Sequence, residues 1–143
     1  MHQRLAHAIP NQRQQVRTHP LYWCFLLLLC AAYIQGGLTK AFDFPAALAE
    51  MRHFGLAPER PLALLTIAGE LGASLLILSG VLRWAGALYL ALFTFAANFV
   101  ANRFWELAEP ARMMAANGFF EHLGLVGAFL IVAWVDVKGG PPR

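Results

Sequence analysis

The sequence predicts an all-α integral membrane protein, a four-helix transmembrane bundle with short interfacial helices in the connections after helices 1 and 3. Hydrophobic residues make up 59% of the 143-residue chain and charged residues only 13%, about half the charge that a soluble domain carries. The apolar residues form four runs, each near the ~20 residues with which an α-helix crosses the hydrocarbon core. Because no run alternates polar and apolar residues as a membrane strand does, a β-barrel is disfavoured.

The four runs are joined by connections of unequal length. They are Leu21–Leu38, Pro61–Val81, Trp84–Ala101 and Phe119–Val135. Only Leu82 and Arg83 separate the second run from the third, which predicts a tight helical hairpin, and Gly80 suits the end of its first helix. Aromatic and basic residues stand at the ends of the runs, where a helix meets the lipid headgroups.

The first long connection, residues 41–60, predicts a short helix on the membrane surface. Asp43 and Pro45 favour its start, and Gly55 favours its end. Three apolar residues would share one face of this helix and two polar residues would lie nearer the other: Phe44, Leu48 and Met51, then Glu50 and His53.

The second long connection, residues 102–118, holds a similar signal. Glu109 and Pro110 favour the start of a short helix, and the pair Asn117–Gly118 favours its end. We therefore expect an interfacial helix in this connection as well.

The chain is expected to divide into a polar basic N-terminal tail (residues 1–20), a four-helix transmembrane domain (21–138) and a C-terminal tail (139–143). Four spans put both termini on the same side of the membrane. Lysine and arginine are shared almost evenly between the two sides. Arg83 in the shortest loop favours a cytoplasmic position for both termini, because the positive-inside rule weighs short loops most.

Composition and motifs exclude several classes of function. The net charge is +3, but the basic residues are scattered between apolar runs; this favours lipid headgroups as partners over nucleic acid, which needs a dense basic patch. The chain has no nucleotide-binding, nucleophile-elbow or haem-attachment motif, and His122 is the only histidine within the runs. No catalytic residue, metal site or intrinsic cofactor is therefore predicted. If the chain takes part in electron transfer, the carrier is a bound quinone or a partner's cofactor.

The polar residues inside the runs are predicted to gather in one half of the membrane, on the side of the long connections. The first and third helices end on that side, and the second and fourth begin there. Glu70 lies nine residues into the second run, or about 13 Å deep at 1.5 Å per residue. The candidate ligand-binding residues on this side are Gln35, Lys40, Glu70, Asn98, Asn102, Arg103 and His122.

Glu70 is predicted to point into the bundle, because a charged carboxylate facing lipid at the midplane costs roughly 2.5–3.5 kcal/mol. There it could meet Asn98, or a basic group such as Lys40 or Arg103, or remain protonated. Its neighbours at four-residue spacing share its helix face: Thr66 and Ser74, with the same spacing in Thr94, Asn98 and Asn102 and in Ala31, Gln35 and Thr39.

A second interpretation stays open for several of these residues. Amide and hydroxyl side chains in membrane bundles often serve only interhelical hydrogen bonding, and Gln35 and Asn98 fit that role as well as ligand binding. His122 is either a proton carrier or ligand, or a structural histidine at the membrane interface.

Three segments carry residues in a recognisable order. The first run closes with GGLTK, which includes Gly37 and Lys40, and the second contains GELGASLLILSGVLRWAG, which includes Glu70, Gly80 and Arg83. From about Leu21 to Val135 the chain resembles the DoxX family of small four-span membrane proteins, whose patterns G-x-x-K and E…G…R these segments fit. The fourth run, FFEHLGLVGAFLI, is similar to a third family segment at Phe120, Leu123 and Gly127. It departs from that segment at Glu121 and His122, where lysine and asparagine are usual.

The resemblance implies a location in the inner membrane and a four-helix bundle. Named members of the family are similar to subunits of quinol oxidase or thiosulfate–quinone oxidoreductase systems, or are linked to thiol-stress complexes. Together with the polar residues, this leads to the hypothesis of an accessory component of a quinone-linked redox system, with a pocket around Glu70 and an oxidoreductase subunit as partner.

Two alternatives belong to other classes of function. One is small-molecule or proton-coupled transport through the same pocket. The other is a purely structural subunit that docks a partner protein through its interfacial segments; assembly as a homo-oligomer is also open.

Overall fold

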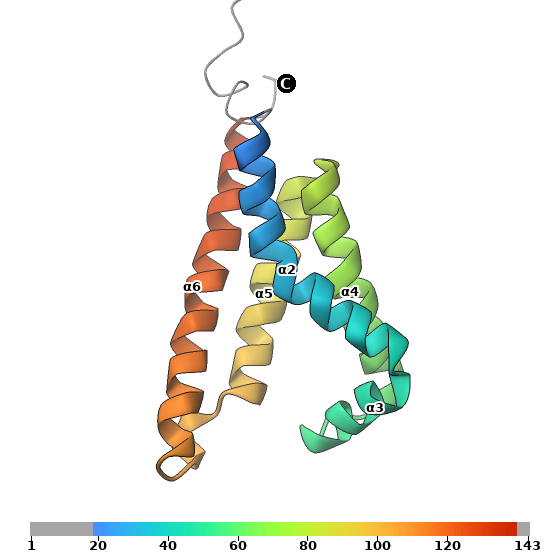
Figure 1. Cartoon of the computed structure of the whole chain (residues 1–143), viewed down its shortest axis with the longest axis vertical. Coiled ribbons are helices and arrows are strands. Elements are labelled where there is room, and N and C mark those ends of the chain that lie inside the picture. The colour runs from blue at the N-terminus through green and yellow to red at the C-terminus, as the bar shows by residue number, and fades with distance from the viewer. Residues whose placement is uncertain (1–18, 140–143) are drawn as a thin grey trace, which may run out of the picture.

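The computed structural model describes residues 19–139, which form four long helices and two short ones (Figure 1). The long helices are α2 (Pro20–Phe42), α4 (Glu59–Ser79), α5 (Arg83–Ala101) and α6 (Ala111–Lys138), and the short ones are α3 (Phe44–His53) and the 3₁₀ helix η1 (Phe104–Glu106). The four long helices are each part of a segment long and apolar enough to cross a membrane. The predicted four-helix membrane bundle is thus confirmed, whereas most of the predicted tails, residues 1–18 and 140–143, lies outside the described residues.

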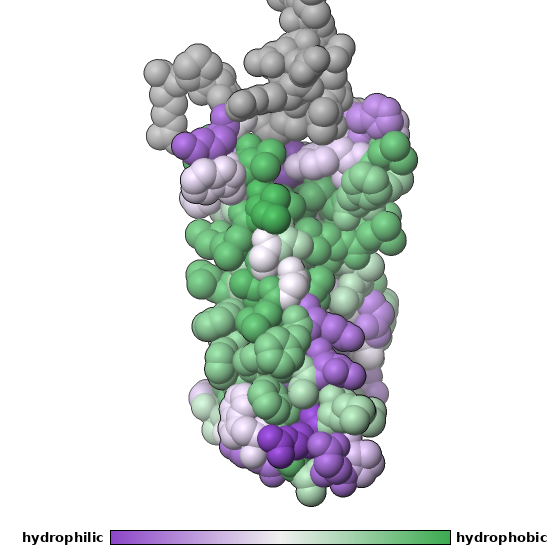
Figure 2. All heavy atoms as spheres, turned by 90° about the vertical axis from the view of Figure 1, so that its left-hand side faces the viewer, coloured by the Kyte–Doolittle hydropathy of each residue, from purple (hydrophilic) through white to green (hydrophobic). Residues whose placement is uncertain are grey.

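The bundle has two chemically different ends. In Figure 1 the start of α2, the α4–α5 turn and the end of α6 lie at one end, and α3 and η1 lie at the other; we call these the terminal end and the connection end. Helix α5 packs against both α4 and α6, while α2 packs mainly against α4. Seen from the side of α6 (Figure 2), hydrophobic residues cover most of the surface, and hydrophilic residues gather at the ends and towards the connection end.

The half of the bundle near the terminal end is filled by a buried apolar cluster. Its fully buried members come from all four long helices and include Cys30, Ile77, Leu90 and Phe129. Helices α4 and α5 pack at backbone distance there, because a Cβ atom on Gly86 would lie 2.6 Å from the carbonyl oxygen of Ala73. Small residues at such contacts are the usual means by which membrane helices associate closely.

The turn between α4 and α5 buries an arginine that was predicted to lie in an interfacial loop. Gly80, with φ of 79°, ends α4 as predicted, and Arg83 is the first residue of α5 and only 5% exposed. Its Nε donates a hydrogen bond to the Ile77 carbonyl at 2.9 Å. Its guanidinium lies 3.9 Å from an Asp136 oxygen on α6 and over the rings of Tyr22 and Trp23 on α2. Arg83 therefore connects α2, α4 and α6 at the terminal end.

The predicted short helix after the first span is confirmed as α3. Only Asp43 separates it from α2, and the Asp43 carboxylate accepts a hydrogen bond from the Ala46 backbone N–H at 3.0 Å, which stabilises the start of α3. Ala47 and Met51 are buried against Ala63 of α4. Helix α3 is thereby fixed to the bundle, and its Glu50 faces Lys40 of α2.

The second long connection differs from the prediction. Its only separate helix among the described residues is η1, and the predicted helix end at Asn117–Gly118 is wrong, because both residues lie inside α6. Glycine at 118 serves a close contact instead of a helix end: a Cβ atom there would lie 3.1 Å from Oδ1 of Asn102. The first turns of α6 pack beside the end of α5 for this reason.

Candidate functional site

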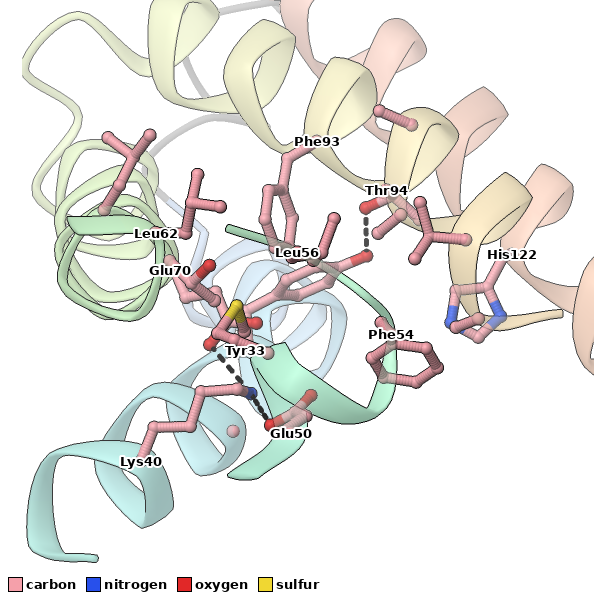
Figure 3. Close-up of a pocket in the computed structure, with 18 of the residues that line it drawn as sticks. Tyr33, Lys40, Glu50, Phe54, Leu56, Leu62, Glu70, Phe93, Thr94 and His122 are labelled. Atoms are coloured by element: carbon pink, nitrogen blue, oxygen red, sulfur yellow. Dashed lines mark hydrogen bonds and ion pairs between the residues drawn. The ribbon is translucent and has the colours of Figure 1, made fainter. Parts of the chain in front are cut away.

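A cavity of about 440 Å³ lies in the half of the bundle near the connection end. Residues from all five α-helices line it, and most of its wall is apolar or aromatic (Figure 3). The volume falls within the range typical of small-molecule sites, which combine apolar walls with a few polar groups. The charged and hydrogen-bonding side chains on the wall are Tyr33, Lys40, Glu50, Thr66, Glu70, Tyr89, Thr94 and His122.

Glu70 points into the cavity from the middle of α4, and its side chain is only 9% exposed. Helix α2 passes close to α4 beside this carboxylate. A Cβ atom on Gly37 would lie 2.7 Å from Leu71, whereas one on Gly36 would only touch Oε2 of Glu70 and Nζ of Lys40, each at 3.4 Å. Glycine at position 37 therefore lets α2 approach α4 closely where the carboxylate and the ammonium meet.

The Lys40 ammonium lies between two carboxylates. Its Nζ is 3.5 Å from Oε2 of Glu70 and 3.8 Å from Oε2 of Glu50 on α3, as the dashed lines of Figure 3 show. The Lys40 side chain is 15% exposed and that of Glu50 is 43% exposed, so the group extends from the cavity towards solvent. Two carboxylates with one ammonium leave an excess of negative charge at the cavity.

One oxygen of Glu70 is incompletely satisfied. Within residues 19–139, Oε2 of Glu70 is the buried side-chain polar atom that has no hydrogen-bond partner. Lys40 is at ion-pair distance from this oxygen and makes no hydrogen bond with it. Since nearly all buried polar atoms in proteins have a partner, this oxygen is available to a hydrogen-bond donor that enters the cavity.

A hydrogen-bonded pair of hydroxyl groups joins α2 to α5 at the cavity wall. The Tyr33 hydroxyl lies 2.5 Å from Oγ1 of Thr94, and Thr94 donates its hydroxyl hydrogen to the Leu90 carbonyl at 2.6 Å. Because a threonine hydroxyl has a single hydrogen, Tyr33 must be the donor to Thr94. The Tyr33 ring also makes an edge contact with Phe129 of α6, with 5.3 Å between the ring centroids.

Asn98 and Asn102 connect α5 to α6 outside the cavity wall. Asn98 is 1% exposed and donates from Nδ2 to the Phe119 carbonyl at 3.0 Å. Asn102 donates from Nδ2 to Oδ1 of Asn98 at 2.8 Å. Both amides thus make interhelical or local hydrogen bonds, which is the second interpretation that the sequence left open for Asn98.

His122 lies on the cavity wall, one helical turn after Gly118. Its Nδ1 is 2.6 Å from the Gly118 carbonyl oxygen. A carbonyl can only accept, so Nδ1 carries the hydrogen, and in the neutral ring the lone pair is on Nε2.

Gln35 and Arg103 lie on exposed surfaces. Gln35 faces away from the bundle on α2 and donates from Nε2 to Oγ1 of Thr39 at 2.9 Å. Arg103 lies beside η1, with its guanidinium 3.3 Å from a Glu106 oxygen. Of the seven predicted site residues, the structure brings Lys40, Glu70 and His122 to the cavity; the four others lie outside its wall.

Five polar residues of the wall were not among the predicted site residues: Tyr33, Glu50, Thr66, Tyr89 and Thr94. For Tyr33 the signal was present, because Tyr33, Gly36, Gly37 and Lys40 follow the three- and four-residue spacing of one helix face. For Tyr89 the signal was weak. Its hydroxyl lies directly against Gly69, where any Cβ atom would overlap it, and such a contact between helices has no sequence pattern.

The fold and the site define a four-span integral membrane protein with a buried acid–base pair beside a cavity. Comparison with protein families matches the chain to DoxX over residues 25–103, more than half of its length. The chain belongs to the DoxX family. The matched region includes Lys40, Glu70 and Arg83 and ends before His122. Comparisons with curated proteins and with solved structures give no match.

Proposed function

We propose that this protein is an accessory inner-membrane component of a quinone-linked redox system, and that the cavity beside Glu70 binds a quinone headgroup. In this proposal an oxidoreductase subunit is the partner that exchanges electrons with the bound quinone. Both termini are assigned to the cytoplasm, so that the cavity lies in the outer half of the bilayer. A quinone supplies two-electron, two-proton chemistry that the chain's own residues lack.

The observation that carries the proposal is the free Oε2 atom of Glu70. It is buried beside an ammonium, faces the cavity and has no hydrogen-bond partner among the described residues. A hydroxyl group on a bound ring would donate to this oxygen. Glu70 then accepts the hydrogen bond or the proton, and Lys40 offsets the charge of the carboxylate.

The aromatic lining of the cavity supports a ligand that has an apolar ring. Phe54 and Phe93 lie on the wall between the Glu70–Lys40 pair and His122 in the view of Figure 3. Aromatic side chains favour stacked or edge contacts with another ring. The ring of a quinone would satisfy these walls, and its tail would extend into lipid.

Binding is better supported than passage across the membrane. Transport needs a route to both faces, and the half of the bundle near the terminal end is occupied by the buried cluster that includes Ile77, Leu90 and Phe129. Because such packing has few voids larger than a water molecule, a ligand at Glu70 has access from the connection end or from lipid, and not from the terminal end.

The variant Glu70→Gln is expected to bind the ligand at least about tenfold more weakly, since hydrogen bonds to charged groups contribute about 1.5–3 kcal/mol. The measurement is isothermal titration calorimetry on protein in detergent micelles, with a decyl-substituted benzoquinone and its quinol as probes. The affinity of whichever form binds more tightly is compared between the wild type and the variant.

Glu121→Gln is the matched control, because Glu121 is an exposed acid on α6 in the same half of the bundle and is not on the cavity wall. Its affinity should equal that of the wild type. A folded Glu70→Gln variant with unchanged affinity would remove Glu70 from the site, and a wild type that binds neither probe saturably would refute the proposed function.

A further inference from the structure

We infer that the cavity selects the reduced, hydroxyl-bearing form of its ligand over the oxidised form, whose ring oxygens are carbonyls. The inference rests on the proposed function and concerns which redox state the site holds. It follows from the hydrogen-bonding capacity that remains on the cavity wall after the protein's own hydrogen bonds are counted.

Glu70 contributes the first free acceptor. Its carboxylate lies 3.5 Å from the Lys40 ammonium, and in this ion pair it can only accept hydrogen bonds. Its Oε2 is buried and has no hydrogen-bond partner within residues 19–139. A ligand oxygen that carries a hydrogen can bond to this atom, whereas a carbonyl oxygen would meet it lone pair to lone pair.

Tyr33 contributes the second acceptor. Its hydrogen is directed to Oγ1 of Thr94, because Thr94 already donates to the Leu90 carbonyl. The Tyr33 oxygen therefore offers lone pairs and no hydrogen to the cavity. If the Tyr33 hydroxyl donated its hydrogen to a ligand instead, the Tyr33–Thr94 hydrogen bond between α2 and α5 would be lost.

His122 contributes the third acceptor. Its Nδ1 hydrogen is used on the Gly118 carbonyl at 2.6 Å, which leaves the lone pair of Nε2 in the neutral ring. In Figure 3 the Tyr33 ring lies between the Glu70–Lys40 pair and His122, with its hydroxyl directed to Thr94. The three acceptors thus reach the cavity wall from three helices, α4, α2 and α6.

Among the polar side chains of the wall, only Lys40 is purely a donor. Its ammonium lies at ion-pair distance from the carboxylates of Glu50 and Glu70, 3.8 and 3.5 Å away. The hydroxyls of Thr66 and Tyr89 can donate or accept and so do not discriminate between the two ligand forms. A ring with two hydroxyl groups can donate to these acceptors, whereas a ring with two carbonyls leaves Oε2 of Glu70 buried without a hydrogen-bond partner, which is unfavourable.

The test compares the two redox forms of one probe on the intact protein. A decyl-substituted benzoquinol and its benzoquinone are titrated separately into protein in detergent micelles under anaerobic conditions. We expect the quinol to bind at least tenfold more tightly; each tenfold preference raises the midpoint potential of the bound two-electron couple by about 30 mV. Equal affinities, or tighter binding of the quinone, would overturn the selectivity and leave the proposed function in place. Binding of neither form would overturn both.

Two variants assign the preference to the acceptors. Tyr33→Phe removes one acceptor and should reduce the ratio of quinol to quinone affinity at least threefold, while Tyr22→Phe, a matched change on the same helix outside the cavity wall, should leave it unchanged. Glu70→Gln replaces an acceptor by an amide that also donates, so it should lower the ratio as well. A ratio that neither Tyr33→Phe nor Glu70→Gln alters would refute the assignment to these groups.

Discussion

Replacing Lys40 with methionine is expected to lower the free energy of unfolding by about 2–4 kcal/mol, because it leaves the buried Glu70 carboxylate without its cation. Methionine keeps most of the apolar length of the lysine side chain and removes the ammonium, which lies 3.5 Å from Oε2 of Glu70. The second carboxylate, Glu50, is 43% exposed and is stabilised by water, so its loss of a partner contributes little. The measurement is equilibrium unfolding in mixed micelles with increasing denaturing detergent.

A double variant separates the electrostatic effect from simple loss of packing. Lys40→Met combined with Glu70→Gln should recover at least half of the lost stability, since no buried charge remains. Lys138→Met is the matched control, because Lys138 is exposed at the end of α6, where its ammonium lies 5.0 Å from the centroid of the Trp134 ring; it should change stability by less than about 1 kcal/mol. If Lys40→Met costs as much with glutamine at position 70 as with glutamate, the ion pair does not stabilise the bundle.

Replacing Arg83 with methionine is expected to cost about 2–4 kcal/mol of unfolding free energy, because several buried contacts are lost together. The guanidinium hydrogen-bonds the Ile77 carbonyl at 2.9 Å, faces Asp136 and lies 5.0 Å from the centroid of the Trp23 ring. These contacts reach three other helices. The loss should therefore appear as a lower stability of the whole bundle and not as a local change in the turn.

Arg83→Lys sharpens this prediction. Lysine keeps the charge but lacks the planar guanidinium, which can donate hydrogen bonds and stack on aromatic rings at the same time. Lysine should therefore recover less than half of the lost stability. The control is Arg112→Met, at an exposed arginine in the first turn of α6, which should leave stability nearly unchanged. Wild-type stability in Arg83→Met would show that Arg83 is only an interfacial cation, as the sequence alone suggested.

The spans, the hairpin at Gly80 and the helix after the first span could be predicted because their signals are local. Run length and hydropathy identify a transmembrane helix without knowledge of its neighbours. A glycine with positive φ and an aspartate that accepts a hydrogen bond at a helix start act within a few residues of themselves. The prediction at Gly118 was wrong because this glycine serves a contact with Asn102, which lies sixteen residues earlier, directly after the end of α5.

The candidate site could be predicted only in part. Glu70 could be predicted to point into the bundle because a charged carboxylate in lipid is energetically unfavourable. Lys40 was one of its predicted partners, and the structure pairs the two. Residue spacing, however, identifies a helix face without saying which neighbour that face meets. Thr94 and Asn98 lie one turn apart on α5, yet Thr94 lines the cavity while Asn98 bonds to the Phe119 carbonyl of α6.

The same limit explains Gln35 and Arg83. Gln35 was expected in the pocket, but it lies on the outer face of α2, where Thr39 satisfies part of its hydrogen-bonding capacity. Arg83 was expected in the loop, but it is buried because Tyr22, Trp23 and Asp136 surround it. Those partners lie more than fifty residues away in the chain, and only the packing of the helices brings them together.

The measurement that tests the central claim most directly is mass spectrometry of the small molecules extracted from protein purified from its native membrane in mild detergent. The account predicts a stoichiometric quinone or quinol in the wild type and in Glu121→Gln, and a strongly reduced amount in Glu70→Gln. Recovery of bulk phospholipid alone, or of equal amounts of quinone from all three proteins, would contradict the claim that the cavity beside Glu70 binds a quinone.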